Sequence, residues 1–179
     1  MTDMFRNFAL PPIGKSAIWF AVVLGTLVPA TTALVVIGMA DALGDKAMVV
    51  VALQAVVALL VLAILLPMWR RQVAFDGKQL RVKATYYSRQ SPLSDFRLDE
   101  ARVVDTRERT EFKPLVKTNG FGLPGFWAGH FLLRDKRKAF CLVTDVGKVL
   151  ALPHADGRVW LLSFEHPQAV LDILRRAAA

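Results

Sequence analysis

Cysteine and histidine are scarce in this chain, and their scarcity excludes several kinds of site. A single cysteine, Cys141, excludes an intramolecular disulfide, and its apolar surroundings predict a small buried side chain. The three histidines are far apart and show none of the spacings of a metal site. The serines and acidic residues form no pattern typical of nucleophilic catalysis. We therefore expect neither a metal nor a cofactor, and no enzymatic activity.

Charge is absent from two long stretches near the N-terminus. No Asp, Glu, Lys or Arg occurs in residues 16–40 or 47–69, which are 25 and 23 residues long. A helix rises about 1.5 Å per residue, and about 20 apolar residues span the hydrocarbon of a bilayer. The few residues between the stretches suffice only for a turn. The sequence therefore predicts a two-helix transmembrane hairpin over residues 16–69, with spans at about 17–40 and 47–69.

A cleavable signal peptide and a pair of buried core helices are the alternatives to this hairpin. A signal peptide would end soon after the small residues at 29–33, but the chain continues apolar through Met39. Buried helices of this length would need a larger soluble domain than the 110 residues that follow. Inside the stretches, Pro29 is expected to distort the first helix and Gln54 to hold the two helices together. The lack of ionisable groups argues against an ion pathway.

The basic residues that flank the hairpin predict its orientation. Arg6 and Lys15 precede the first stretch, and Arg70 and Arg71 follow the second, whereas the loop between them carries two aspartates and one lysine. Cytoplasmic flanks are enriched in Lys and Arg. We therefore expect both termini in the cytoplasm, with residues 1–15 forming a cytoplasmic tail.

From residue 70 to residue 179, the apolar residues alternate as they do in strands. Asp76-Gly77 between two alternating runs predicts a β-hairpin over residues 73–84. Further strands are expected at residues 86–90, 98–106, 127–134, 138–144, 148–152 and 158–162, the last four as an antiparallel meander. An apolar stripe after Pro167 predicts a C-terminal amphipathic helix. The expected fold is therefore mainly β, with about seven antiparallel strands in a partly open barrel that the helix caps.

Residues 107–126 are expected to be irregular, because glycines and a proline crowd their second half. Residues 120–125 spell G-x-G-x-x-G, but a dinucleotide site needs a helix to start there, and here a strand pattern follows. Long irregular loops in compact domains are often functional. Residues 107–117 of this stretch are therefore a candidate contact for a protein partner, with a merely mobile loop as the alternative. Their basic residues are Arg107, Arg109, Lys113 and Lys117.

The net charge of +8 belongs entirely to the part after the hairpin, where 20 Lys and Arg face 12 Asp and Glu. Nucleic-acid-binding motifs are missing, so a nucleic-acid partner is not expected. Each basic residue near an anionic leaflet contributes about 1 kcal/mol of binding. Contacts with anionic lipid headgroups are therefore predicted for the first five basic residues after the hairpin, with a merely solvated face as the alternative: Arg70, Arg71, Lys78, Arg81 and Lys83.

Two stretches, NGFGLPGFWAGHFLLRDKRKAFCLVTD and VLALPHADGRVWLLSFEHPQAVLDILRR, resemble the bacterial pleckstrin-homology (PH-like) domains found behind membrane hairpins. The resemblance covers residues 72–177 and is carried by the Gly-x-Pro-Gly bend at 122–125, the short turns, and Ser163 and Pro167 before the last helix. It implies a seven-stranded fold with a capping helix, at the bacterial inner membrane, that binds without catalysis. Eukaryotic relatives hold phosphoinositides in a basic first hairpin loop, which here is only residues 76–78.

The sequence as a whole predicts a membrane-anchored, non-enzymatic binding module at the inner leaflet, which recognises a protein partner or anionic lipid. Anchoring raises the effective concentration of the domain near membrane partners, so weak contacts suffice. The alternative is an accessory subunit or assembly factor of a larger membrane complex, such as a transporter or a cell-envelope enzyme. Both hypotheses leave open the identity of the ligand and whether the chain forms a homo-oligomer.

Overall fold

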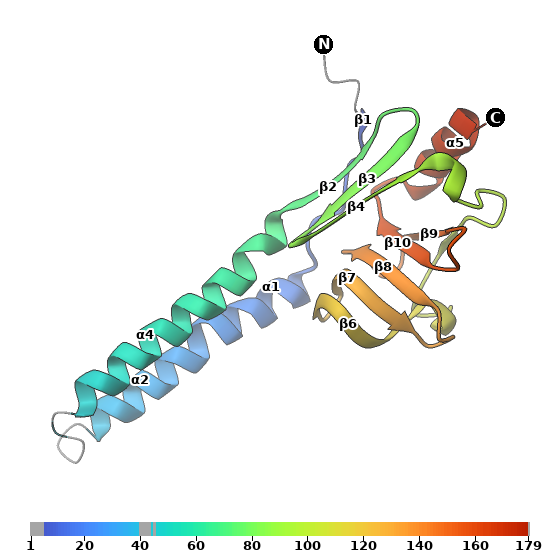
Figure 1. The fold of residues 1–179 in the computed structure, drawn as a ribbon. Coiled ribbons are helices and arrows are strands. Elements are labelled where there is room, and N and C mark those ends of the chain that lie inside the picture. Colours follow the sequence, from blue (N-terminus) through green and yellow to red (C-terminus); the bar gives the residue numbers. More distant parts are fainter. Residues whose placement is uncertain (1–5, 40–43, 45, 179) are drawn as a thin grey trace, which may run out of the picture. The chain divides into compact units, whose positions relative to one another are not determined.

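The computed structural model describes residues 6–39, 44 and 46–178. Its chain divides into two compact units (Figure 1). One unit is the helical hairpin Lys15–Met68, and the other joins the segment before Lys15 to the chain from Trp69 onward. The loop expected between the helices lies outside the described residues except for Gly44 and Lys46, as do residues 1–5 of the expected tail.

The helical unit consists of two long apolar helices. The first runs from α1 (Lys15–Val22) through a π-helical turn η1 (Val23–Leu27) into α2 (Val28–Gly38). The second is α4 (Lys46–Leu65), followed by a 3-10 turn η2 (Leu66–Trp69). Both helices are long and apolar enough to cross a membrane. A core helix or a signal sequence would pass the same test of length and composition.

The distortion expected at Pro29 is the π-helical turn that ends at Leu27, two residues before this proline. Proline lacks an N–H group, and its ring clashes with the carbonyl four residues earlier, so the regular hydrogen-bond ladder cannot continue through it. On either side of Pro29, the hydroxyl of Thr26 donates to Val22 O at 2.7 Å and that of Thr31 to Leu27 O at 3.0 Å. These hydroxyls are satisfied within their own helix.

Gln54 joins the two helices, as the sequence predicts. Its Nε2 atom donates to the carbonyl oxygen of Pro29 at 3.4 Å. The large apolar side chains around the hairpin are mostly uncovered: Leu34 is 68% exposed and Met48 is 79% exposed. A core helix of a soluble domain would bury such side chains, whereas the described chain leaves this apolar surface open.

The β unit begins with a four-stranded antiparallel sheet in the order β1-β2-β3-β4. Its strands are β1 (Arg6–Asn7), β2 (Arg71–Phe75), β3 (Gln79–Ala84) and β4 (Tyr87–Pro92). The hairpin predicted at Asp76-Gly77 joins β2 to β3. Asp76 Oδ1 closes this turn by accepting from the backbone N of Gln79 at 2.6 Å and of Lys78 at 2.9 Å. These hydrogen bonds lower the pKa of Asp76.

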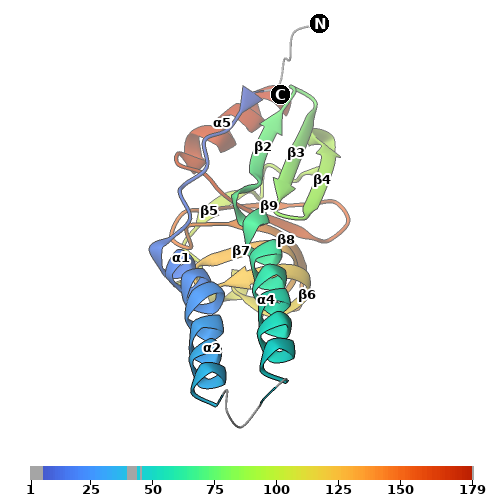
Figure 2. The same cartoon turned by 90° about the vertical axis from the view of Figure 1, so that its left-hand side faces the viewer.

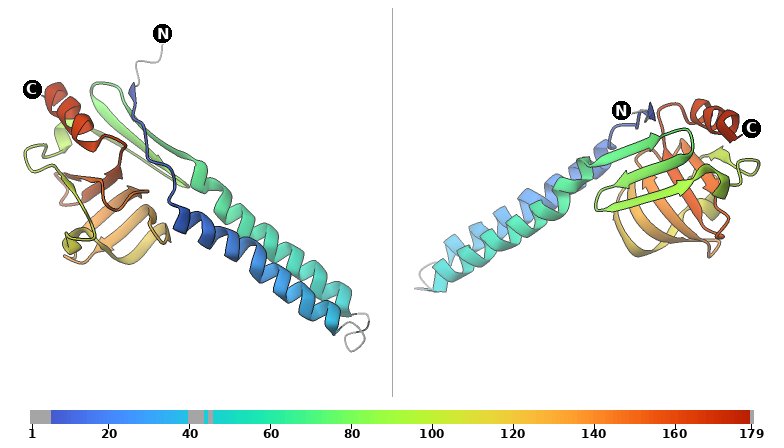
Figure 3. Two further views of the ribbon diagram at one scale, coloured as in Figure 1. Left: turned by 180° about the vertical axis from the view of Figure 1, so that it is seen from behind. Right: turned by 45° about the horizontal axis from the view of Figure 1, so that its top comes forward.

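A second sheet has six strands in the order β5-β9-β10-β8-β7-β6. Its strands are β5 (Arg102–Val104), β6 (Pro114–Leu123), β7 (Phe126–Leu133), β8 (Lys138–Val143), β9 (Val149–Pro153) and β10 (Val159–Ser163). β8, β9 and β10 carry almost uninterrupted runs of buried residues. Such runs are typical of strands that are covered on both faces. Figure 3 shows the first sheet lying across the second.

The predicted meander of the last four strands, and with it the all-antiparallel barrel of seven strands, is wrong. β10 lies between β8 and β9, parallel to β8 and antiparallel to β9. Ser163, at the end of β10, fastens this arrangement to the end of β8. Its Oγ atom accepts from the backbone N of Thr144 at 3.2 Å and donates to the carbonyl oxygen of Asp145 at 2.9 Å.

The prediction that residues 107–126 are irregular is also wrong, since most of these residues form β6 and its hairpin with β7. The glycines mark close packing rather than a break in the strand. A Cβ atom on Gly120 would lie 2.9 Å from Ala128 O and 2.9 Å from the ring of Phe131. The bend is confined to the turn at Gly125, which has a φ of 76°. A 3-10 turn, η4 (Thr110–Phe112), precedes β6.

The C-terminal helix α5 (Pro167–Ala178) begins at the predicted proline and buries its apolar stripe. Val170, Leu171 and Leu174 are buried, and the Arg175 guanidinium donates to Leu98 O at 3.0 Å and to Ala101 O at 3.1 Å. These carbonyls lie between the 3-10 turn η3 (Leu93–Asp95) and β5. The expectation of a mainly β domain with a C-terminal capping helix is therefore confirmed.

The segment before the hairpin is part of the β unit that follows the hairpin. β1 extends the first sheet by pairing with β2, and the blue N-terminal segment runs beside β2 in Figure 2. Phe8 is only 9% exposed, and its ring meets that of Phe164 edge-on at 5.6 Å between centroids. The backbone N of Phe8 donates to Val73 O at 3.0 Å, and that of Glu165 to Ala9 O at 3.2 Å. Two parts of the chain that the hairpin separates thus share one core.

Candidate functional site

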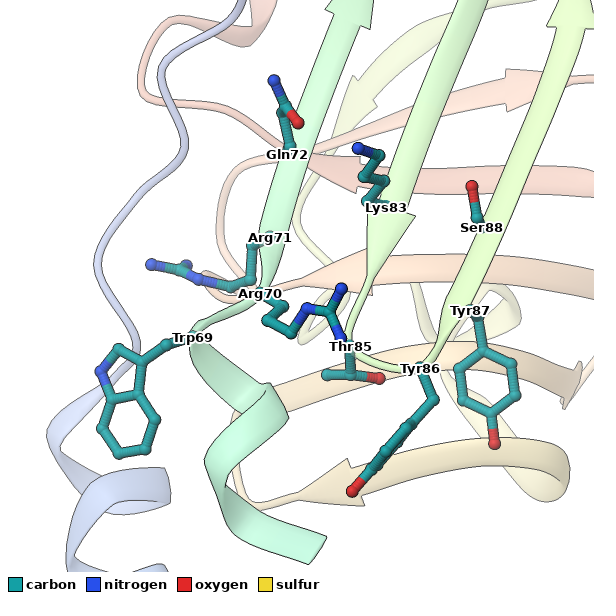
Figure 4. Close-up of a pocket in the computed structure, with 9 residues that line it drawn as sticks. All are labelled: Trp69, Arg70, Arg71, Gln72, Lys83, Thr85, Tyr86, Tyr87 and Ser88. Atoms are coloured by element: carbon teal, nitrogen blue, oxygen red, sulfur yellow. The ribbon is translucent and has the colours of Figure 1, made fainter. Parts of the chain in front are cut away.

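An open hollow of about 700 Å³ lies where β2 begins, β3 ends and β4 begins (Figure 4). Among the described residues, its lining includes the cations Arg70, Arg71 and Lys83 and no acidic side chain. Three of the five residues predicted to contact lipid headgroups are therefore brought together. The hollow starts at Trp69, the last residue of the second uncharged stretch.

The strand register arranges the polar side chains of this hollow in a row. Gln72 lies opposite Lys83, and Lys83 lies opposite Ser88, so the three side chains project from the same face of the sheet. The backbone N of Thr85 donates to Arg70 O at 2.9 Å, which closes the end of β3 against the start of β2. The Arg70 side chain extends toward Thr85 in Figure 4. Thr85 has a φ of 56°, a strained conformation for a β-branched residue at a potential binding site.

Arg71, the first residue of β2, has a different role from Arg70, which directly precedes the strand. Its guanidinium points away from that of Arg70, and its Nη1 atom donates to Pro11 O at 2.8 Å. Its Nε atom is buried and makes no hydrogen bond within the described residues. Burial lowers the pKa of Arg71. Arg71 thus ties the N-terminal segment to β2 and leaves a partly desolvated positive charge behind the hollow.

Two exposed aromatic side chains stand at the mouth of the hollow. Trp69 is 62% exposed and Tyr86 is 58% exposed. Both have an apolar ring and a polar group, the combination that is enriched where a membrane meets water. The sequence predicts an interfacial role for Trp69 from its place at the end of an apolar stretch, whereas Tyr86 reaches the hollow only through the turn between β3 and β4.

The other two predicted headgroup residues, Lys78 and Arg81, lie outside the lining of this hollow. Lys78 is in the turn at the far end of the hairpin, five residues from Lys83, which corresponds to roughly 16 Å along an extended strand. Arg81 lies two residues before Lys83 and therefore on the same face. Contact of either residue with lipid remains a prediction.

The basic residues predicted to contact a protein partner are not gathered in one site. Arg107 forms an ion pair with Asp105, with 2.6 Å between Nη2 and Oδ2. This pairing raises the pKa of Arg107 and lowers that of Asp105. Arg109 lies 3.4 Å from Glu111, while Lys113 and Lys117 are exposed, Lys117 on β6. Exposed ion pairs of this kind contribute little to stability, and the role of these four residues in partner binding remains a prediction.

Ser91, His154 and Asp156 form a chain of contacts like that of a serine hydrolase. Ser91 Oγ lies 2.8 Å from His154 Nε2, and His154 Nδ1 lies 2.9 Å from Asp156 Oδ1. Ser91, however, is only 7% exposed, and its hydroxyl also donates to Asp95 Oδ2 at 3.2 Å. A nucleophile must reach its substrate beside an oxyanion site. The cluster instead joins the end of β4 to the turn between β9 and β10 as a structural clamp.

The described residues contain no cluster of side chains that could bind a metal ion. Within residues 6–39, 44 and 46–178, no three His, Cys, Asp or Glu side chains lie together as a metal site requires. Cys141 is wholly buried in the core of the second sheet, and burial raises the pKa of its thiol. A thiol in this state is unreactive.

The described fold is that of a small β domain, with a C-terminal helix and a basic hollow, placed directly after an apolar helix. A family model described as "Bacterial PH domain" matches residues 71–178. The chain therefore belongs to the bacterial PH domain family, and the resemblance predicted from the sequence is confirmed. Domains of this kind are generally non-catalytic binding modules.

No curated protein and no solved structure matches the chain. The family membership therefore supplies the class of protein, and the ligand must be inferred from the geometry of the hollow.

Proposed function

We propose that the hairpin anchors this protein in the bacterial inner membrane, and that the hollow beside Trp69 binds the phosphate of an anionic phospholipid headgroup. The observation that carries this proposal is the hollow that Arg70 and Lys83 line, with the charge of Arg71 behind them and no acid among its described lining residues. It starts directly after a long apolar helix. If that helix crosses a bilayer, residues 69–71 lie at its surface, because they directly continue the chain.

The open apolar surface of the two helices supports anchoring. Each helix exceeds the length that crosses hydrocarbon, and most of the large apolar side chains around the hairpin are exposed within the described chain. The segments before Lys15 and after Met68 belong to one compact unit. This common unit favours a topology in which both ends of the hairpin lie on one side of the membrane. The basic flanks favour the cytoplasmic side.

The chemistry of the hollow supports a phosphate ligand. Arg70 and Lys83 supply positive charge, and the amide of Gln72 and the hydroxyl of Ser88 supply neutral donors from the same face. Trp69 and Tyr86 suit the headgroup region of a bilayer. Without an acid in the lining, the cations have no internal counter-charge at this site, so an anionic ligand would lower their electrostatic free energy.

Replacing both Arg70 and Lys83 by glutamine is expected to weaken binding of phosphatidylglycerol by about 30-fold. Each basic residue near an anionic headgroup contributes about 1 kcal/mol, and about 1.4 kcal/mol corresponds to a tenfold change in Kd. The measurement titrates a fluorescent short-chain phosphatidylglycerol into the full chain in maltoside micelles and follows its anisotropy.

The matched control for this experiment replaces Arg134 and Lys148 by glutamine, which removes the same charge from exposed turns outside the hollow. Its affinity for the lipid is expected to stay within about twofold of the wild type. Equal weakening in both double variants would show attraction to net charge alone and would contradict the proposed site. A stoichiometric protein that co-purifies in mild detergent would favour the accessory-subunit alternative.

A further inference from the structure

A second hollow, of about 410 Å³, opens at the edge between the two sheets. Arg89 enters it from β4, the edge strand of the first sheet. His130 on β7, Lys138 at the start of β8 and Arg158 just before β10 enter it from the second sheet. This hollow shares no lining residue with the hollow beside Trp69.

The charge in this second hollow is unbalanced. Three cations line it, and no acidic side chain from the described part of the chain does. Arg158 forms an ion pair with Asp156, which does not line the hollow, with 3.4 Å between Arg158 Nε and Asp156 Oδ2. Lys138 makes no ion pair within the described residues, and Arg89 directs its Nε atom to a neutral acceptor, His130 Nε2, at 3.3 Å. Arg89 and Lys138 thus have no carboxylate partner among the described residues, and an anion in the hollow would lower their electrostatic free energy.

His130 adds an unsatisfied polar atom to this hollow. Because its Nε2 accepts from Arg89, its proton is assigned to Nδ1. That Nδ1 atom is buried and makes no hydrogen bond of accepted geometry within the described residues. Burial lowers the pKa of His130, and the charges of Arg89 and Arg158 lower it further, while the backbone of Asn119 acts in the opposite direction. Burial and the surrounding positive charges thus favour the neutral form of the imidazole.

The wall around His130 is rigid, which suits a preformed site. Tyr87 meets the imidazole edge-on at 5.9 Å between ring centroids, and its hydroxyl donates to Asn119 Oδ1 at 2.9 Å. Phe140 packs on the imidazole at 5.2 Å between centroids. The Thr118 hydroxyl donates to the carbonyl oxygen of His130 at 3.1 Å. These contacts come from β4, β6 and β8, so they fix the ring from three strands.

We propose that this inter-sheet hollow is a second anion site, which takes a phosphate group through Arg89, Lys138 and Arg158. The Arg89 guanidinium, whose hydrogen bond goes to a weak neutral acceptor, would gain a charged one. The flexible Lys138 side chain closes over the ligand from the exposed end of β8. This assignment holds whether or not the first hollow binds lipid.

The experiment uses the full chain with ¹⁵N-labelled histidine in phosphate-free maltoside micelles and adds inorganic phosphate. Bound phosphate offsets the charges of Arg89 and Arg158 near the ring, so the pKa of His130 measured by NMR titration is expected to rise, while added phosphate leaves the resonances of His154 and His166 unchanged. Lys138→Gln is expected to weaken binding about tenfold, and the matched charge change Lys148→Gln to leave it unchanged.

A second arm places the chain in lipid discs without added phosphate. A rise in the pKa of His130 on adding inorganic phosphate in micelles identifies a soluble anion as the ligand. A rise seen only in phosphatidylglycerol discs, and not in phosphatidylcholine discs, identifies a lipid headgroup. Absence of a response in both arms overturns the proposal, as does a response that survives Arg89→Gln and Lys138→Gln. Unchanged His154 and His166 resonances verify that each variant is folded, and Lys138→Gln, at an exposed residue, carries the test if Arg89→Gln does not fold.

Discussion

Replacing Phe8 by alanine is expected to lower the free energy of unfolding of the β unit by about 3 kcal/mol, the lower end of the range for buried aromatic residues. Phe8 is 9% exposed and packs edge-on against Phe164, which is fully buried. The substitution removes a ring from a core that the N-terminal segment shares with the chain before α5. Guanidinium unfolding of the full chain in micelles, followed by tryptophan fluorescence, measures the change.

The control for this prediction is Pro12→Ala, an exposed position in the same segment. This substitution is expected to change the free energy of unfolding by no more than about 0.5 kcal/mol, as other surface substitutions do. If Phe8→Ala were equally mild, the N-terminal segment would contribute nothing to the core, and the account of one folded unit on both sides of the hairpin would be wrong.

Deleting the hairpin is expected to turn the protein from a membrane protein into a soluble one. Gly14 and Trp69 belong to the same compact unit, so a Gly/Ser linker of about 12 residues, with a mean span of about 19 Å, can replace residues 15–68. The full chain should stay with membranes in a carbonate wash, whereas the deletion variant should remain in the supernatant with the NMR spectrum of a folded β domain.

The control for the deletion starts the chain at Trp69 and so also lacks β1 and Phe8. This shorter chain is expected to be the less stable of the two, because Val73 O and Arg71 lose their partners in the N-terminal segment. A hairpin-deleted chain that still resists carbonate would place the membrane attachment in the β unit and contradict an anchor made of the two helices.

The helical hairpin could be predicted from the sequence because it depends on local composition alone. Twenty-five residues without charge define a helix of known length, whatever the chain does elsewhere. The first β-hairpin was equally local, since Asp76-Gly77 both breaks the alternation and closes the turn. The strand order could not be predicted in this way, because the turn residues mark where β8, β9 and β10 end but not which strands pair.

The error at residues 107–126 came from treating glycine as a breaker. Gly120 lies inside β6 because the Phe131 ring and Ala128 O occupy the space of a side chain there. That contact joins residues from two strands, and composition does not reveal it. The place of Phe8 in the core was hidden for a similar reason, since its partner Phe164 follows more than 150 residues later.

The candidate site was predictable where it is close in sequence to the hairpin. Arg70 and Lys83 were identified by proximity to the apolar stretch, and alternation with Val73 would have separated inward-facing Arg71 from outward-facing Arg70. The second hollow was not predictable in this way. Arg89 and His130 are 41 residues apart and on different sheets, so only the packing of the two sheets brings them together.

Cysteine labelling in spheroplasts tests most directly whether the hairpin crosses the membrane with both ends in the cytoplasm. The native Cys141 is wholly buried, so the wild-type chain provides an unreactive background. New cysteines are introduced at two exposed positions, Gly44→Cys between the helices and Ala155→Cys in the β unit. A membrane-impermeant maleimide should label Gly44→Cys in intact spheroplasts and Ala155→Cys only after permeabilisation. Labelling of Ala155→Cys from outside, or of neither cysteine before lysis, would contradict the proposed topology.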